Sequence, residues 1–157
     1  MKLLGVLLFL SATALLTAYS LKRERRKYEE AEGLYLLLLH VKHGIFEGVL
    51  PLSEIYASFE NEALAHTPFL ALLKKEGLAH ALKMCPPPID DAARHSLILY
   101  AEGLGKRFFG EEKQAAEKEC TAFSQTLEKY RHELPARLKI RRTLLLCGSG
   151  MTLLLFL

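Results

Sequence analysis

Hydrophobic positions divide the chain into an uncharged run at each end and a middle with helical spacing. The first run extends from Leu3 to Leu21 and the last from Thr143 to Leu157. Between them, apolar residues recur at steps of three and four, without the period of two that marks a half-buried strand. The pattern predicts an all-α fold: a helical bundle of short helices between two long helices, an N-terminal transmembrane helix and a C-terminal apolar membrane segment.

The lengths of the two apolar runs set the expected domain boundaries. At about 1.5 Å per residue, the first run spans roughly 28 Å as a helix, close to the hydrocarbon thickness of a bilayer. The last run reaches only about 22 Å, so it either crosses with help from flanking arginines, lies in one leaflet, or packs on the domain. We expect residues 1–21 to be a transmembrane anchor, 22–142 a cytoplasmic helical domain and 143–157 a membrane-embedded segment.

Basic residues stand beside both apolar runs, on the side of the middle domain. A secretion signal would carry its cations before the first run, yet only Lys2 precedes it and Ala18-Tyr19-Ser20 is a poor cleavage site. The positive-inside rule then places the N-terminus outside and the domain in the cytoplasm. Anionic lipid headgroups suit these cations better than nucleic acid does. The membrane-flanking basic residues are Lys22, Arg23, Arg25, Arg26, Lys27, Arg137, Lys139, Arg141 and Arg142.

Start and stop signals predict several short helices in the middle. The Leu34–Leu39 run is apolar all round, which indicates a helix buried on several sides that continues from the anchor. Later boundaries follow from cap and breaker residues. These are Pro51 in the first turn of a helix, Thr67 as a cap, Gly77 as a break, Pro86 to Pro88 as a stop, Asp90 or Asp91 as a cap, and Gly103 with Gly105 as an end.

The last helix, from Glu111 onward, has the clearest periodicity. An apolar seam with alternating steps of four and three contains Ala116, Cys120, Phe123, Leu127, Tyr130 and Leu134. Pro135 falls inside the pattern and should kink the helix. Charged residues between the seam positions form a solvated face, and we take four of them as a candidate partner face: Glu117, Lys118, Glu128 and Lys129.

Reactive groups are sparse, and we expect no enzyme. His40 and His43 have a spacing that can ligate metal, but no HExxH or cysteine cluster supports such a site. Asp90 and Asp91 suit a helix cap better than a catalytic dyad. The glycines of "AEGLGKRFFGEE" match no phosphate-binding motif and indicate a helix-to-helix turn. We therefore predict no catalytic, cofactor-binding or metal-binding residues, no cofactor, no small-molecule substrate and no nucleic acid.

Two further features of the composition concern aromatic and thiol side chains. Phe108 and Phe109 lie at the expected turn, where we predict that they join the core; exposed, they would instead form a partner-binding patch.

Cys85, Cys120 and Cys147 are odd in number and widely spaced, which indicates reduced thiols in a cytosolic domain.

The whole layout resembles the stage III sporulation protein AB family of endospore-forming bacteria. The resemblance lies in the "MKLLGVLLFL" start, the following basic run, "GIFEGVLPLSEI" at 44–55, "EGLGKRFFGEEKQ", and the close "RLKIRRTLLLCGSGMTLLLFL". It covers essentially the full length in order. The chain departs from the family at 103–114, where the turn is longer and lacks the usual Asp, with Gln114 as the matching glutamine.

The resemblance implies a non-enzymatic membrane platform or scaffold in the sporulation channel complex between mother cell and forespore. The helical domain is similar to the cytoplasmic domains of type II secretion and type IV pilus platform proteins. Its implied partners are membrane lipid, a cytosolic secretion-type ATPase and other sporulation-channel proteins, in the mother-cell membrane facing the forespore. The alternative is a small membrane-tethered adaptor or signalling scaffold unrelated to sporulation.

Overall fold

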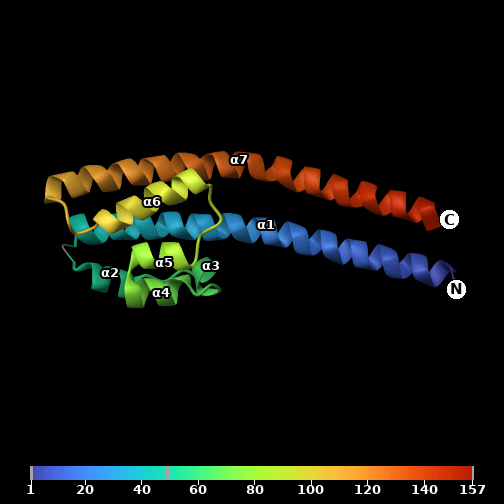
Figure 1. Cartoon of the computed structure of the whole chain (residues 1–157), viewed down its shortest axis with the longest axis horizontal. Coiled ribbons are helices and arrows are strands. Elements are labelled where there is room, and N and C mark those ends of the chain that lie inside the picture. Colours follow the sequence, from blue (N-terminus) through green and yellow to red (C-terminus); the bar gives the residue numbers. More distant parts are fainter. Residues whose placement is uncertain (1, 49, 157) are drawn as a thin grey trace. The chain divides into compact units, whose positions relative to one another are not determined.

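The computed structural model describes residues 2–48 and 50–156, and the side chains of 11–48, 50–144 and 147 among them. This part of the chain is all-α (Figure 1). The predicted arrangement of short helices between two long ones is confirmed. The helices are α1 (Lys2–Phe46), α2 (Leu52–Ser58), α3 (Glu62–Ala65), α4 (Phe69–Glu76), α5 (Leu78–Met84), α6 (Asp91–Gly103) and α7 (Phe109–Phe156).

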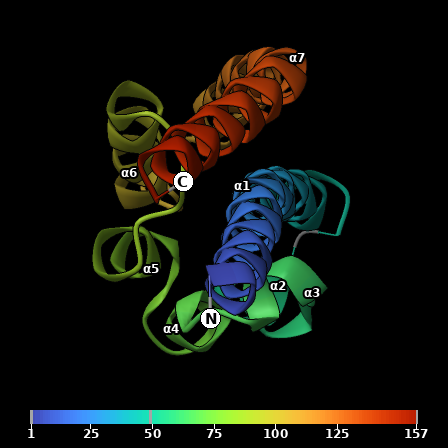
Figure 2. The same ribbon diagram turned by 90° about the vertical axis from the view of Figure 1, so that its right-hand side faces the viewer.

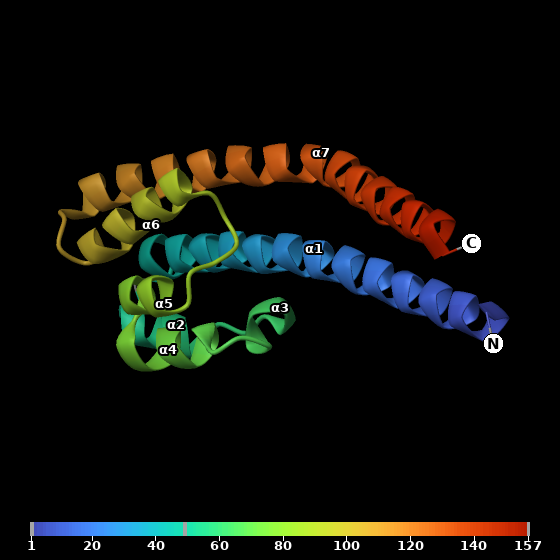
Figure 3. The ribbon, with the colours of Figure 1, turned by 45° about the vertical axis from the view of Figure 1, so that its right-hand side comes forward.

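The chain forms two compact units. Unit 1 consists of Met1–Arg26 and Tyr130–Leu157, and unit 2 of Lys27–Lys129. In each unit α1 and α7 lie side by side and run antiparallel (Figure 1). In unit 2, α2 to α4 lie along α1 and α6 lies along α7, as the end-on and oblique views agree (Figures 2 and 3). The helix α5 packs against both α4 and α6 and so connects the two sides of unit 2.

The helix boundaries in the first half of unit 2 follow the cap and breaker residues. Pro51 is the N-cap of α2. The Asn61 side chain accepts a hydrogen bond from the Leu64 amide at 3.1 Å and caps α3. The Thr67 hydroxyl accepts from the Phe69 amide at 3.3 Å at the start of α4. Gly77 ends α4 with φ 85°, a conformation that a side chain disfavours. The predicted start, cap and break here are confirmed.

The second half of unit 2 also ends its helices where the sequence predicts. The helix α5 stops at Met84, with Cys85 as its C-cap directly before the proline run. Asp90 accepts a hydrogen bond from the Ala93 amide at 2.6 Å and caps α6. The chain leaves α6 after Gly103, and Gly105 has φ 74°. The segment between α6 and α7 is therefore the expected helix-to-helix turn.

Among the described side chains, the hydrophobic core lies within unit 2. The rings of Tyr35 on α1 and Phe123 on α7 stack with their centroids 6.4 Å apart. Leu36 is exposed, so the Leu34–Leu39 run is not buried on every side; its outer face lies opposite the other helices of unit 2. The largest fully buried side chains are Phe69, Leu34, Leu37, Leu38, Ile55, Leu73, Leu78, Leu82, Leu97 and Val41.

The apolar seam of α7 is buried only over its first half. Ala116, Cys120 and Phe123 are buried as predicted. Leu127, Tyr130 and Leu134 are half-buried, because the short helices of unit 2 pack beside the earlier turns. The helix α7 continues through Pro135 to Phe156, so the proline does not end it, and the kink expected there stays a prediction.

Candidate functional site

The histidine pair of α1 is engaged by neighbouring protein groups. His40 Nε2 lies 3.2 Å from the Ile55 carbonyl oxygen and 3.0 Å from Ser58 Oγ. His43 Nδ1 lies 2.8 Å from the Leu39 carbonyl oxygen. Among the described residues, no group of three His, Cys, Asp or Glu side chains is placed to hold a metal ion. The His40 contacts link α1 to α2, and the His43 contact lies within α1.

The acidic pair at the start of α6 has a structural role. Asp90 caps the helix, and Asp91 Oδ1 lies 3.0 Å from Arg94 Nη1 within the same helix. Both interactions stabilise the first turn, where a negative charge also suits the helix dipole. The predicted cap is confirmed at Asp90.

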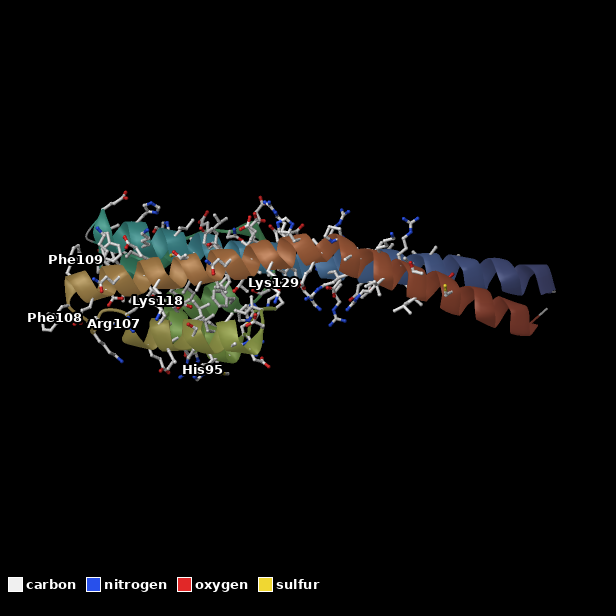
Figure 4. All side chains as sticks on the ribbon, turned by 90° about the horizontal axis from the view of Figure 1, so that it is seen from above. His95, Arg107, Phe108, Phe109, Lys118 and Lys129 are labelled. Carbon is white, nitrogen blue, oxygen red and sulfur yellow. The ribbon has the colours of Figure 1, made fainter. Side chains whose placement is uncertain are left out.

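All four residues of the candidate partner face, Glu117, Lys118, Glu128 and Lys129, have exposed side chains on α7. Lys118 and Lys129 are eleven residues apart, which is about three helical turns, so the two lysines lie on one side of the helix (Figure 4). Glu117 and Glu128 have the same separation. The face is therefore accessible within unit 2, and its binding of a partner stays a prediction.

The expected burial of Phe108 and Phe109 is wrong. Phe108 is 83% exposed and Phe109 62% exposed, at the end of α7 where the turn enters it (Figure 4). Only Phe109 packs on another ring, edge-on to Phe46 with centroids 5.4 Å apart. Arg107 folds back against Gly103 instead, toward Glu112. A cation and a carboxylate thus occupy the inside of the turn and leave the two phenyl rings outside.

Two carboxylates of α7 are buried in unit 2. Glu119 Oε2 accepts a hydrogen bond from Ser96 Oγ on α6 at 3.0 Å. Glu112 lies 3.6 Å from Arg107 Nη1, and neither of its carboxylate oxygens has a hydrogen-bond partner among the described residues. The sequence analysis missed both, although positions 112 and 119 continue the three-and-four spacing of Ala116 and Phe123. That spacing was the available signal.

The buried tyrosines beside this region resist ionisation. Burial raises the pKa of Tyr56 to about 12; a Leu78 backbone group opposes the shift, and Glu112 adds to it. Burial also raises the pKa of Tyr100, with Cys120 and Glu112 as the next contributors. Both phenols therefore stay protonated at neutral pH and act as packing groups.

The membrane-flanking cations do not form one equivalent set. In unit 1, Arg141 Nη2 lies 3.0 Å from Glu24 Oε1, and Arg141 Nη1 lies 3.3 Å from Ser20 Oγ. Glu24 is only 3% exposed. Arg137 donates to Glu133 at 2.6 Å and lies over the Tyr130 ring. Arg137 and Arg141 thus make contacts within the protein, and Arg141 links α7 to α1.

Unit 1 has an inverted distribution of polar and apolar side chains on α1. Over residues 11–26, the buried or half-buried positions are Thr13, Thr17, Ser20, Leu21 and Glu24. The large apolar side chains point outward: Leu15 is 72% exposed and Tyr19 69% exposed, and Leu144 on α7 is 66% exposed. Over residues 11–20 the packed positions of α1 carry hydroxyl groups and the exposed ones are largely apolar; Leu21 is half-buried, and exposed cations follow from Lys22.

The predicted membrane segments lie largely outside the described side chains. In the part of the chain whose side chains are described, no helix is long and apolar enough to cross a membrane. Residues 1–10 of the expected anchor and most of 143–157 fall outside that part.

Comparisons with protein-family models, with curated proteins and with solved structures found no match. The chain's described residues form an all-α protein with an accessible charged face on α7, two exposed phenylalanines and, in unit 1, exposed apolar side chains.

Proposed function

We propose that the protein is a non-enzymatic membrane scaffold: unit 1 holds it in a bilayer, and unit 2 docks a partner protein in the cytoplasm. The observation that carries this proposal is the inverted α1 of unit 1. In water, each large apolar side chain left exposed forgoes about 1.5–3 kcal/mol of burial free energy. In a bilayer the same outward residues meet lipid, and small hydroxylic residues suit contacts between membrane helices.

The resemblance to the stage III sporulation protein AB family gives the scaffold a specific context. We propose a platform in the channel complex between mother cell and forespore that docks a cytosolic secretion-type ATPase. Each long helix enters unit 1 from unit 2, so two connections join the units. A domain connected at two points can transmit tilt or torque from an ATPase, whereas a single connection would let it swivel.

Topology reporters at the two chain ends test the membrane attachment. We expect an external signal from the N-terminus, and an internal signal from a reporter inserted in the turn at Lys106. An external signal at the C-terminus indicates two crossings and a cytoplasmic one indicates a single crossing. External protease that digests residues 30–130 in intact cells would contradict the proposed orientation.

The charged face of α7 is the first candidate for ATPase docking. Reversing the charges of Glu117, Lys118, Glu128 and Lys129 should abolish co-purification of the ATPase with the full chain. Reversing two acids and two lysines elsewhere in unit 2, at Glu54, Glu60, Lys74 and Lys75, is the matched control, since these are also exposed. Unchanged co-purification with the α7 variant would contradict this assignment.

The exposed aromatic pair is a second candidate docking surface. Aromatic side chains that fill a partner's pocket often dominate binding energy, and Phe108 and Phe109 are the exposed pair that the turn presents. Substituting both with Ser leaves the charged face intact. Loss of co-purification with this variant alone would assign docking to the turn.

The alternative function is a membrane-tethered adaptor unrelated to sporulation. The same fold and attachment serve it equally well. Expression timing separates the two: we expect the transcript to rise during sporulation, whereas abundant transcript in vegetative cells would favour the adaptor.

A further inference from the structure

Ion pairing divides the cations of unit 1 into two groups. Arg141 and Arg137 pair with Glu24 and Glu133. The other cations of the two basic runs within unit 1 have exposed side chains and join none of the ion pairs found among the described residues. These six, which we name the collar, are Lys22, Arg23, Arg25, Arg26, Lys139 and Arg142.

Helix geometry directs the collar away from the contact between α1 and α7. Successive residues turn by about 100° around a helix. Glu24 faces α7, so Lys22 and Arg26, two residues before and after it, lie about 160° away on the outer side. On α7, where Arg141 faces α1, Lys139 lies on the outer side in the same way. The Arg141–Glu24 pair therefore holds the two helices at a level where Lys22, Arg26 and Lys139 point outward. Arg23, Arg25 and Arg142 lie about 100° to the side, with exposed side chains.

The collar adjoins the exposed apolar side chains of unit 1. On α1, Tyr19 lies one turn before Lys22 in the sequence, with Leu15 a further turn away; on α7, Leu144 follows Arg142. Along α1 the order is therefore an apolar residue (Leu15), an aromatic residue (Tyr19) and a cation (Lys22). A bilayer presents hydrocarbon, interface and headgroups in the same order. Charge complementarity then identifies the occupant, because the phosphate groups of anionic lipids lie at the headgroup level.

We propose that the collar binds the headgroups of anionic phospholipids, and that Arg141 is a positioning residue that holds the two helices together. This inference rests on the membrane attachment proposed above; to the anionic headgroups expected from the sequence it adds which cations bind them and which one positions the helices. Arginine can donate two parallel hydrogen bonds to one phosphate group. Each cation near an anionic membrane surface increases the affinity for that surface several-fold.

A lipid titration of the detergent-solubilised full chain tests the collar. Short-chain phosphatidylglycerol is compared with the phosphatidylcholine of equal chain length, and the thermal midpoint is followed as lipid is added. We expect the anionic lipid to bind at least about tenfold more tightly, with the preference shrinking as salt rises because surface charges are screened. Equal effects of the two lipids overturn the collar and leave the membrane attachment, which topology reporters test, standing.

Two quadruple variants locate the effect. The collar variant changes Lys22, Arg26, Lys139 and Arg142 to Gln and should lose the preference. The control variant changes Lys74, Lys75, Lys106 and Lys113, exposed lysines of unit 2, to Gln and should retain it. An equal loss in both variants overturns the assignment to the collar. So does salt-sensitive binding of a DNA duplex that phosphatidylglycerol does not displace, because the occupant would then be nucleic acid.

Neighbouring arginines separate positioning from lipid binding. Arg141→Gln and Arg142→Gln remove the same charge at adjacent positions of α7. We expect Arg141→Gln to lower the thermal midpoint in neutral detergent and to keep the lipid preference. Arg142→Gln should keep the midpoint and weaken the preference several-fold. The reverse pattern would make Arg141 the lipid ligand and overturn the division of roles.

Discussion

Buried carboxylates show how strongly single positions depend on the element packed beside them. Glu24 has Arg141 on the opposite helix, and Glu119 has Ser96. Glu112 has only the 3.6 Å approach of Arg107 and no hydrogen bond among the described residues. A charge removed from water without full pairing costs stability. At the α6–α7 turn, the Glu112 carboxylate is thus buried without a hydrogen bond among the described residues, while the Phe108 and Phe109 rings are exposed. Burial of apolar groups and exposure of polar ones would favour the opposite arrangement.

Exposure of the phenyl rings predicts a contrast between two Phe→Ala substitutions. Phe108→Ala should change the free energy of unfolding by less than about 0.5 kcal/mol, since its ring is already in solvent. Phe123→Ala should cost about 3–5 kcal/mol, because Phe123 is 2% exposed and stacks with Tyr35. Chemical denaturation of the two variants measures both values. A large loss with Phe108→Ala would mean that the ring is buried after all.

Buried tyrosines predict a loss of stability in strong base. The pKa of Tyr56 rises from 10.0 to about 12 on folding, and that of Tyr100 also rises. Between these values the folded state binds more protons than the unfolded state, so stability falls as pH increases. The contribution is complete below about pH 10 and declines by about 1.4 kcal/mol per pH unit for each tyrosine above it. Denaturation midpoints from pH 8 to about 12 measure the slope, and Tyr56→Phe should reduce it.

At the scale of elements, one close contact sets the distance between α1 and α2. A Cβ added at Gly44 would lie 2.6 Å from two atoms of Ile55, whose side chain is fully buried. Gly44→Ala should therefore cost about 1–3 kcal/mol. Gly110, in the first turn of α7, has no atom within 4 Å of such a Cβ, so Gly110→Ala should be neutral or stabilise by up to about 1 kcal/mol. Equal melting temperatures for the two variants would contradict this contrast.

Sequence patterns predicted most element boundaries because those signals are local. Pro51, Gly77 and Asp90 act within one turn of the chain. The errors concern what lies beside an element. Phe108 is exposed because Arg107 folds inward in its place. Arg141 is paired because Glu24, more than 100 residues earlier in the chain, lies 3.0 Å from it on the neighbouring helix. Spacing could have indicated the buried Glu112 and Glu119, yet no local pattern identifies their partners.

At the scale of the whole molecule, the two units have opposite relations to solvent. Unit 2 buries its apolar residues around one core, with polar side chains outside. Unit 1 turns hydroxylic residues of α1 inward and apolar ones outward. One chain thus combines a folding pattern suited to water with one suited to lipid, and this division supports a scaffold that is held at a membrane and presents a domain to a partner.

The closed core of unit 2 predicts that this unit folds without the rest of the chain. All residues of the hydrophobic core cluster lie between Leu34 and Phe123, and roughly 100 residues suffice for an independent domain. The fragment Lys27–Lys129 should stay in solution without detergent, give a helical circular dichroism spectrum and melt cooperatively. The same fragment with Phe123→Ala is the control and should melt at a lower temperature. The full chain should require detergent, because it adds the exposed apolar residues of unit 1. An unfolded or aggregated fragment would show that unit 2 depends on the pairing of α1 and α7 in unit 1, and the membrane would then support the fold as well as hold it in place.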